Sequence, residues 1–186
     1  MSAPTGWEGI LDPGENIIWQ GRPDGAITLK PRNIMLLIFG LFFAGFALFW
    51  MAMAASSGGG FWMFGLIHFS VGLGIIFSAL FWGAYKRRHS WYTLTDRRAI
   101  ISSDLPMLGK KIKSWPITAT SVLELIQGPP DTVNFAERTK RSRNASHQIT
   151  IGFERIDNGV EVYRMMRDIQ TNAQARDLLA AKKDDG

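Results

Sequence analysis

The chain of 186 residues has a formal net charge of +5 and contains no cysteine. The absence of cysteine excludes disulfides, thiolate metal sites and a cysteine nucleophile. The length leaves room for one modest folded domain beside a membrane segment, but not for two large domains. Acidic side chains outnumber basic ones in residues 1–33, so the basic excess belongs to residues 86–186. Because a basic region next to a bilayer is attracted to anionic lipid headgroups, we expect no nucleic-acid partner.

Residues 1–33 are predicted to form a cytoplasmic N-terminal segment, and two uncharged apolar stretches follow it. The stretches cover residues 34–55 and 61–85, and neither contains Asp, Glu, Lys or Arg. A spanning helix needs about 20 such residues, whereas a helix on a soluble core usually keeps a polar face. The connecting residues 56–60 are serine and glycine, so the helices must run antiparallel. Residues 34–85 therefore predict a transmembrane helical hairpin whose first partner is the lipid bilayer.

Basic residues flank this predicted hairpin at one end only. The outer loop, residues 56–60, is uncharged, whereas the opposite ends of the two helices carry Lys30, Arg32, Lys86, Arg87 and Arg88. Cytoplasmic loops of membrane proteins are enriched in Lys and Arg. We therefore expect a multi-pass protein with both termini in the cytoplasm.

Small residues recur at intervals of four along both apolar stretches. The first stretch has Gly40 and Ala44, and the second has Ser70, Gly74 and Ser78. Such rows allow close approach of helices in lipid. Packing of the two helices within one chain is the favoured interpretation, and contact with a helix of a partner is the alternative.

His68 is the ionisable residue within the second stretch. Ionisable groups at membrane depth often have a function, such as a metal ligand or a proton relay. Neither stretch contains another His or any Asp, Glu or Cys, so one chain cannot complete such a site. We expect a neutral histidine that forms a hydrogen bond between the helices or lies near the outer headgroups, and we expect no metal or cofactor.

The remaining residues, 89–182, have the pattern of a small β domain with one terminal helix. Tyr92 and Leu94 alternate with threonines before a turn at Asp96–Arg97, which predicts two strands within residues 91–102. Further strands are predicted at 110–117, 122–127, 132–135 and 148–153. Val162, Met166, Ile169 and Ala173 lie on one stripe at helical spacing, which predicts an amphipathic helix over residues 158–181.

Three segments carry a likeness to a known family. They are LDPGENIIWQGRP at residues 11–23, YTLTDRRAIISS at 92–103 and GFERIDNGVEVYRMM at 152–166. Together with the hairpin, they resemble the bacterial pleckstrin-homology-like membrane domains. The resemblance implies an α+β membrane protein of the bacterial inner membrane, with an antiparallel β-barrel capped by a C-terminal helix and no catalytic residues. The chain departs from the family pattern at residues 135–147, where the strand connection is expected to be long and basic.

A basic tract within that connection contains Arg138, Lys140, Arg141 and Arg143. A solvated loop tip, a docking site for an acidic protein surface and a contact for anionic lipid headgroups are the three interpretations. We find no phosphate-binding glycine loop, nucleophile elbow or metal-ligand spacing, and we therefore expect a binding function and no enzyme. The leading hypothesis is a membrane-anchored module that binds or positions a protein partner. The alternative is an accessory or assembly subunit of a larger inner-membrane complex.

Overall fold

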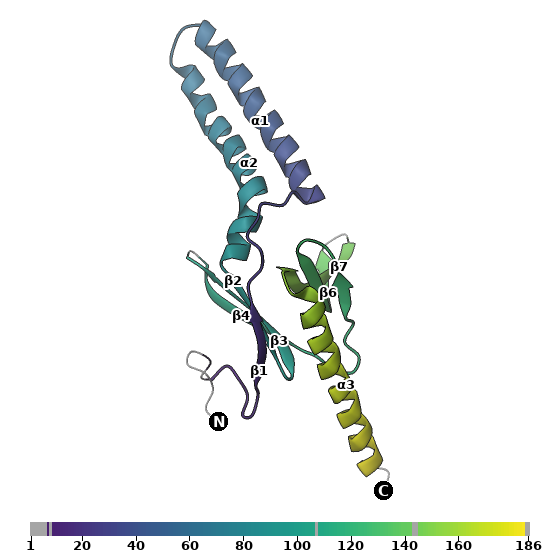
Figure 1. The fold of residues 1–186 in the computed structure, drawn as a ribbon. Coiled ribbons are helices and arrows are strands. Elements are labelled where there is room, and N and C mark those ends of the chain that lie inside the picture. The colour runs from purple at the N-terminus through teal and green to yellow at the C-terminus, as the bar shows by residue number, and fades with distance from the viewer. Residues whose placement is uncertain (1–6, 8, 107, 143–144, 185–186) are drawn as a thin grey trace. The chain divides into compact units, whose positions relative to one another are not determined.

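The computed structural model describes residues 7, 9–106, 108–142 and 145–184 (Figure 1). The chain divides into two compact units. One unit is Gly25–Arg87, and the other combines Met1–Asp24 with Arg88–Gly186. The first is a helical hairpin and the second contains all the strands. The hairpin is therefore an insertion within the sequence of the β-containing unit.

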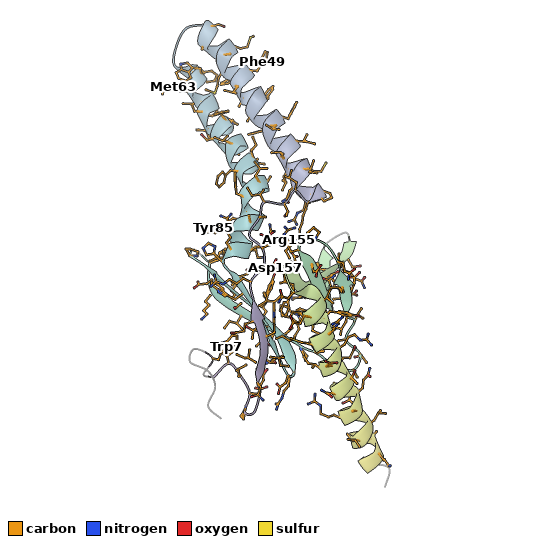
Figure 2. All side chains as sticks on the ribbon, viewed as in Figure 1. Trp7, Phe49, Met63, Tyr85, Arg155 and Asp157 are labelled. Carbon is orange, nitrogen blue, oxygen red and sulfur yellow. The ribbon has the colours of Figure 1, made fainter. Side chains whose placement is uncertain are left out.

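The helical unit consists of α1 (Pro31–Ser56), the 3₁₀ helix η1 (Phe61–Phe64) and α2 (Gly65–Arg88). Pro31 lies at the start of α1. Its missing N–H costs no hydrogen bond there, because the first N–H groups of a helix have no intrahelical partner. Gly58 and Gly59 have φ angles of 74° and 114° in the turn, a conformation that suits glycine. Both helical segments are long and apolar enough to cross a membrane. Their outward side chains are exposed in the isolated chain, as Figure 2 shows for Phe49.

A four-stranded antiparallel sheet has the order β1-β2-β3-β4. Its strands are β1 (Ile17–Gly21), β2 (Ser90–Thr95), β3 (Arg98–Leu105) and β4 (Gly109–Pro116). The predicted turn at Asp96–Arg97 joins β2 to β3, which confirms that part of the sequence analysis. No strand is predicted in residues 1–33, yet β1 lies there and pairs with β2 across the whole hairpin insertion.

A three-stranded antiparallel sheet has the order β5-β6-β7 and is followed by α3 (Gly159–Asp184). Its strands are β5 (Glu124–Ile126), β6 (Asp131–Ser142) and β7 (Ala145–Ile156). The expected long connection at residues 135–147 is wrong, because β6 pairs with β7 as far as Ser142 and Ala145. The strands are longer than predicted since the end of this ribbon lacks the apolar alternation that marks a strand packed on a core.

The core of the β-containing unit lies between the two sheets and α3. Leu94 comes from β2, Phe153 from β7 and Met166 from α3, and all three are fully buried. The Phe153 ring has its centroid 4.8 Å from that of Tyr92 and 5.0 Å from that of Phe135. Val162, Met166 and Ile169 are buried in this core, so these three positions of the predicted stripe of α3 are confirmed. Ala173 is only half-buried, and Leu178 and Leu179 farther along the helix are exposed.

The expected closed barrel is wrong. Within the described residues every strand pair belongs to one sheet or the other, and no pair joins the two sheets. The connection after β4 turns away at Ile117, which is buried in the core. Gln170 of α3 then donates hydrogen bonds from its Nε2 to the carbonyl oxygens of Ala119 and Ser121, at 3.2 and 2.7 Å. This connection therefore runs to α3 and the second sheet, so β4 and β5 do not pair.

Candidate functional site

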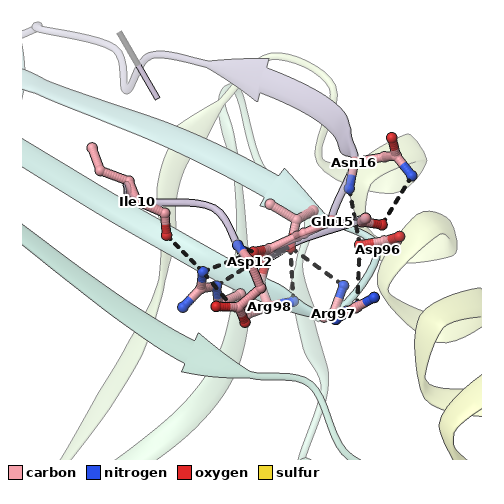
Figure 3. Close-up of polar contacts among 9 residues, drawn as sticks. Ile10, Asp12, Glu15, Asn16, Asp96, Arg97 and Arg98 are labelled. Atoms are coloured by element: carbon pink, nitrogen blue, oxygen red, sulfur yellow. Dashed lines mark hydrogen bonds and ion pairs between the residues drawn. The ribbon is translucent and has the colours of Figure 1, made fainter. Parts of the chain in front are cut away.

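Glu15 clasps the segment before β1 to the four-stranded sheet. Its carboxylate accepts hydrogen bonds from Arg98 Nη2 at 2.7 Å, Arg98 Nε at 2.9 Å and the Thr95 hydroxyl at 2.7 Å (Figure 3). The Asp12 backbone N–H donates a further bond at 2.8 Å. The Glu15 side chain is 0% exposed, and Arg98 also donates to the Ile10 carbonyl at 2.8 Å. The contacts fix residues 10–15 on the sheet.

The protonation of Glu15 follows from these contacts. Burial of the carboxyl raises its pKa. The hydrogen bonds from Arg98, Asp12 and Thr95 and the charge of Arg98 outweigh this effect and lower the pKa to about 2. The pKa of Arg98 is raised, first by its hydrogen bonds to Glu15. Glu15 is therefore ionised at neutral pH, and the clasp is a charged pair with its acceptors satisfied.

A cavity of about 510 Å³ lies on the same unit. Its lining includes Trp7, Arg22, Trp91, Ser102, Asp104 and Lys110. Tyr92 and Leu94 belong to the core, and side chains alternate along a strand, so Trp91 and Thr93 lie on the opposite face. Ser102 pairs with both Trp91 and Ile112, which extends this face across β3 and β4. The cavity therefore occupies the face of the four-stranded sheet that does not form the core.

The charged groups of this cavity come from three different segments. The Arg22 guanidinium lies over the Trp91 ring, 4.8 Å from its centroid, a cation–π contact. Asp104 and Lys110 are directly opposite each other in the β3–β4 register, and both are exposed. The Asp104 backbone N–H donates to the His89 carbonyl at 2.9 Å. Two cations and one carboxylate thus converge beside aromatic rings, an arrangement suited to holding a small polar ligand.

This cavity is not predicted from the sequence. Its polar residues are far apart in the sequence, and none belongs to a recognisable motif. The available signal was the polar alternation of residues 91–95, which leaves Trp91 on the face away from the core. The pairing of β1 with β2, which brings Arg22 beside Trp91, could not be read from that alternation.

The predicted basic tract lies on the β6–β7 ribbon instead of a loop. Arg138 pairs with Ile149, and its side chain is exposed. The backbone of Lys140 pairs with His147 and that of Arg141 with Ser146. Arg143 lies outside the described residues. The tract therefore begins on a strand that extends from the core, and its ligand stays a prediction.

The predicted basic flanks differ in what they do. Lys30, Arg32, Lys86 and Arg88 are exposed, but Arg87 is buried. Arg87 Nη2 donates to the Ala26 carbonyl at 2.5 Å and to the Thr28 hydroxyl at 3.2 Å. This arginine therefore links the end of α2 to the segment before α1, in addition to any role in membrane orientation.

The helices pack through only part of the predicted small-residue rows. Gly40 and Ala44 of α1 are buried, but Ser70, Gly74 and Ser78 of α2 are exposed. The contact face of α2 instead has Gly65, Gly72 and Ala79 buried. A Cβ built on Gly72 would lie 2.9 Å from the Ala44 backbone nitrogen, whereas one on Gly74 would meet nothing within 4 Å. Packing of Ser70, Gly74 and Ser78 against α1 is therefore wrong, because this row faces away from α1.

His68 does not bond across to α1. A ring nitrogen lies 3.4 Å from the Phe64 carbonyl oxygen, one turn earlier on the same helical segment. The ring packs beside Phe43 and Phe64, with centroid distances of 6.2 and 5.6 Å. It lines an apolar concavity of about 270 Å³. The expected interhelical hydrogen bond is thus replaced by a local one, with aromatic packing against α1.

No protein-family model, curated protein or solved structure matches the chain. The resemblance to pleckstrin-homology-like membrane domains therefore stays a prediction from the quoted segments.

Proposed function

We propose that this chain is a non-enzymatic binding module anchored in the bacterial inner membrane. In this proposal the hairpin of α1 and α2 spans the bilayer, and the two-sheet unit binds a partner at the cytoplasmic surface. The observation that carries the proposal is the insertion of an apolar hairpin between two strands that pair with each other. The outward side chains of the hairpin, such as Phe42 at 72% exposed, need lipid or another apolar partner to cover them.

The pairing of β1 with β2 supports a specific topology. Gly21 lies opposite Tyr92, and these residues come shortly before α1 and shortly after α2. Both ends of the hairpin must therefore be on one side of the membrane for the strands to pair. Lys30, Arg32, Lys86 and Arg88 favour the cytoplasmic side by the positive-inside rule.

Two contacts hold the end of the N-terminal segment on the binding unit itself. Asp24, the last residue before the helical unit, forms an ion pair with Arg155 of β7, and its backbone N–H donates to the Arg155 carbonyl at 2.7 Å. Arg155 has a φ angle of 56°, an uncommon conformation for a residue other than glycine. Because tethering to a membrane raises the effective concentration of partners, a modest binding surface is sufficient.

Membrane anchoring and orientation can be tested together with single-cysteine variants, because the chain has no cysteine of its own. Ser57→Cys places a thiol in the hairpin turn, and Thr120→Cys places one between β4 and β5. We expect both proteins to stay in the membrane pellet after a carbonate wash. A membrane-impermeant maleimide should label Ser57→Cys in spheroplasts and Thr120→Cys only after permeabilisation. Release by carbonate, or the reverse labelling, would contradict the proposal.

A second candidate function is a subunit of a larger membrane complex. The exposed row of Ser70, Gly74 and Ser78 favours it, because small residues allow a helix of another protein to approach closely. Migration in mild detergent separates the two candidates. A subunit should migrate with a large assembly at a fixed ratio, whereas a recruiting module should migrate mostly alone.

A further inference from the structure

The cavity on the open face of the four-stranded sheet has a composition that selects one class of ligand. Its charged groups are the Arg22 guanidinium, the Lys110 ammonium and the Asp104 carboxylate. Within the described parts of the chain, none of the ion pairs involves these three residues. The cavity therefore presents both signs of charge to a ligand.

The three charged groups are spread over the strands of the sheet, with one cation at the β1 side and a carboxylate beside a second cation at the β4 side. Arg22 follows β1 and lies over Trp91 of β2, while Asp104 and Lys110 lie opposite each other on β3 and β4. A phosphate can accept hydrogen bonds from Arg22 and Lys110. A primary ammonium can donate to Asp104 and lie against an indole face of Trp7 or Trp91. A ligand with a phosphate and an ammonium a few bonds apart satisfies all three charged groups.

Chain connectivity keeps one residue of this cavity close to the end of α2. Trp91 is three residues beyond Arg88, where α2 ends, so it cannot be farther than about 11 Å from that end of the helix. With α2 in the bilayer, Trp91 is held within reach of the lipid headgroups. Tryptophan is also enriched at this depth in membrane proteins.

We propose that this cavity binds the phosphoethanolamine headgroup of a membrane phospholipid. The inference rests on the proposed membrane anchoring and names the ligand of the anchored unit. The headgroup phosphate binds Arg22 and Lys110, and its ammonium binds Asp104. A choline headgroup has no N–H to donate to Asp104, and a glycerol headgroup carries no cation, so both should bind more weakly. A cavity of about 510 Å³ is within the usual range for small-ligand sites.

The test uses the full chain in nanodiscs of phosphatidylcholine containing a minor fraction of phosphatidylethanolamine or phosphatidylglycerol. Native mass spectrometry after release into detergent counts the phospholipids that remain bound. We expect one phosphatidylethanolamine to be retained preferentially. Arg22→Ala should reduce its retention roughly tenfold, because a hydrogen bond between charged groups is lost. Asp104→Asn should reduce the preference over phosphatidylcholine.

Lys111→Ala is the matched control, because Lys111 neighbours Lys110 on β4 and points to the opposite face by strand alternation. It should retain phosphatidylethanolamine as the unsubstituted chain does. Thermal unfolding of each variant shows whether a loss of lipid reflects a loss of fold. Arg22→Lys, which keeps the charge, should recover part of the retention if Arg22→Ala unfolds the chain.

Three results would overturn the proposal. They are equal retention of the three lipids, retention unaffected by Arg22→Ala in a folded chain, and saturation by soluble O-phosphoethanolamine with no preference for the lipid. The last result would assign the site to a free metabolite. Incorporation into nanodiscs is measured separately, so failure of membrane anchoring is distinguished from failure of headgroup binding.

Discussion

Gly21 lies opposite Tyr92 in the antiparallel pairing of β1 with β2, although the whole apolar hairpin separates them in the sequence. The pairing continues through Gln20 with Thr93 and Trp19 with Leu94. Trp19 then packs on the core, with its ring centroid 5.5 Å from that of Phe153. The short first strand thus belongs to the same folded unit as the C-terminal half of the chain, and the hairpin is a long connection between neighbouring strands.

We predict that the β-containing unit folds without the hairpin. Replacement of residues 25–87 by a short Gly/Ser/Asn linker should give a soluble protein that unfolds cooperatively, because β1, β2 and the core are retained. Size-exclusion chromatography and thermal circular dichroism check this. The control is the same shortened chain without residues 1–21, which should be markedly less stable. Aggregation of the protein that keeps residues 1–21 would count against the prediction.

The clasp of Glu15 with Arg98 predicts a large effect from a small substitution. Glu15→Gln should lower the free energy of unfolding by about 3 kcal/mol, because it leaves a half-buried arginine without its charged partner. Chemical denaturation of the shortened protein, or of the full chain in detergent, measures the effect. Asp12→Asn is the control, since Asp12 lies 3.8 Å from Arg98 and is mostly exposed. It should cost less than about 1 kcal/mol. If both variants lowered the free energy of unfolding by similar amounts, burial of Glu15 would not strengthen its ion pair with Arg98.

The same residue predicts a pH dependence. The pKa of Glu15 is lowered from 4.5 to about 2 in the folded chain, so its ionisation stabilises the fold fully above pH 4.5. This contribution, about 3 kcal/mol, should be lost as the pH falls from about 4.5 to about 2. Unfolding free energies of the original chain and of Glu15→Gln should therefore converge with falling pH. If the unfolding free energies of the two proteins stayed a constant distance apart between pH 4.5 and pH 2, the lowered pKa of Glu15 would be contradicted.

Two glycines of α2 form a matched pair for testing the helical packing. Gly72→Ala should destabilise the hairpin by about 1–3 kcal/mol, because its new Cβ would press on the backbone of Ala44. Gly74→Ala should be neutral or slightly stabilising, since alanine is the better helix former and its Cβ meets nothing within 4 Å. Thermal unfolding in detergent compares them. A loss of stability for Gly74→Ala in the membrane, but not in dispersed monomers, would indicate a helix of another protein on that face.

The elements that depend on local pattern could be predicted from the sequence. The β2–β3 hairpin follows from the alternation of Tyr92 and Leu94 and from its two-residue turn, and α3 follows from its apolar stripe. The two long helices follow from their composition. Each of these signals lies within a single stretch of chain.

The features that depend on distant pairing could not be predicted. Nothing near Trp19 specifies Leu94 as its partner, and the cavity depends on that pairing. The contact face of α2 was also missed, because intervals of four suggested Ser70, Gly74 and Ser78. Gly65, Gly72 and Ala79 are among the buried residues of α2, and their spacing of seven is typical of antiparallel helices that cross at a small angle.

The order of synthesis gives the β1–β2 pairing a consequence for biogenesis. The first strand leaves the ribosome before either helix. In the proposed topology it has no partner until the second helix has been made and has returned the chain to the starting side. A chain that inserted only one helix would leave β1 and β2 in different compartments, with Trp19 absent from the core. In that topology the sheet is completed only after both helices have been inserted, so an incorrectly inserted chain would present an incomplete sheet to quality-control proteases.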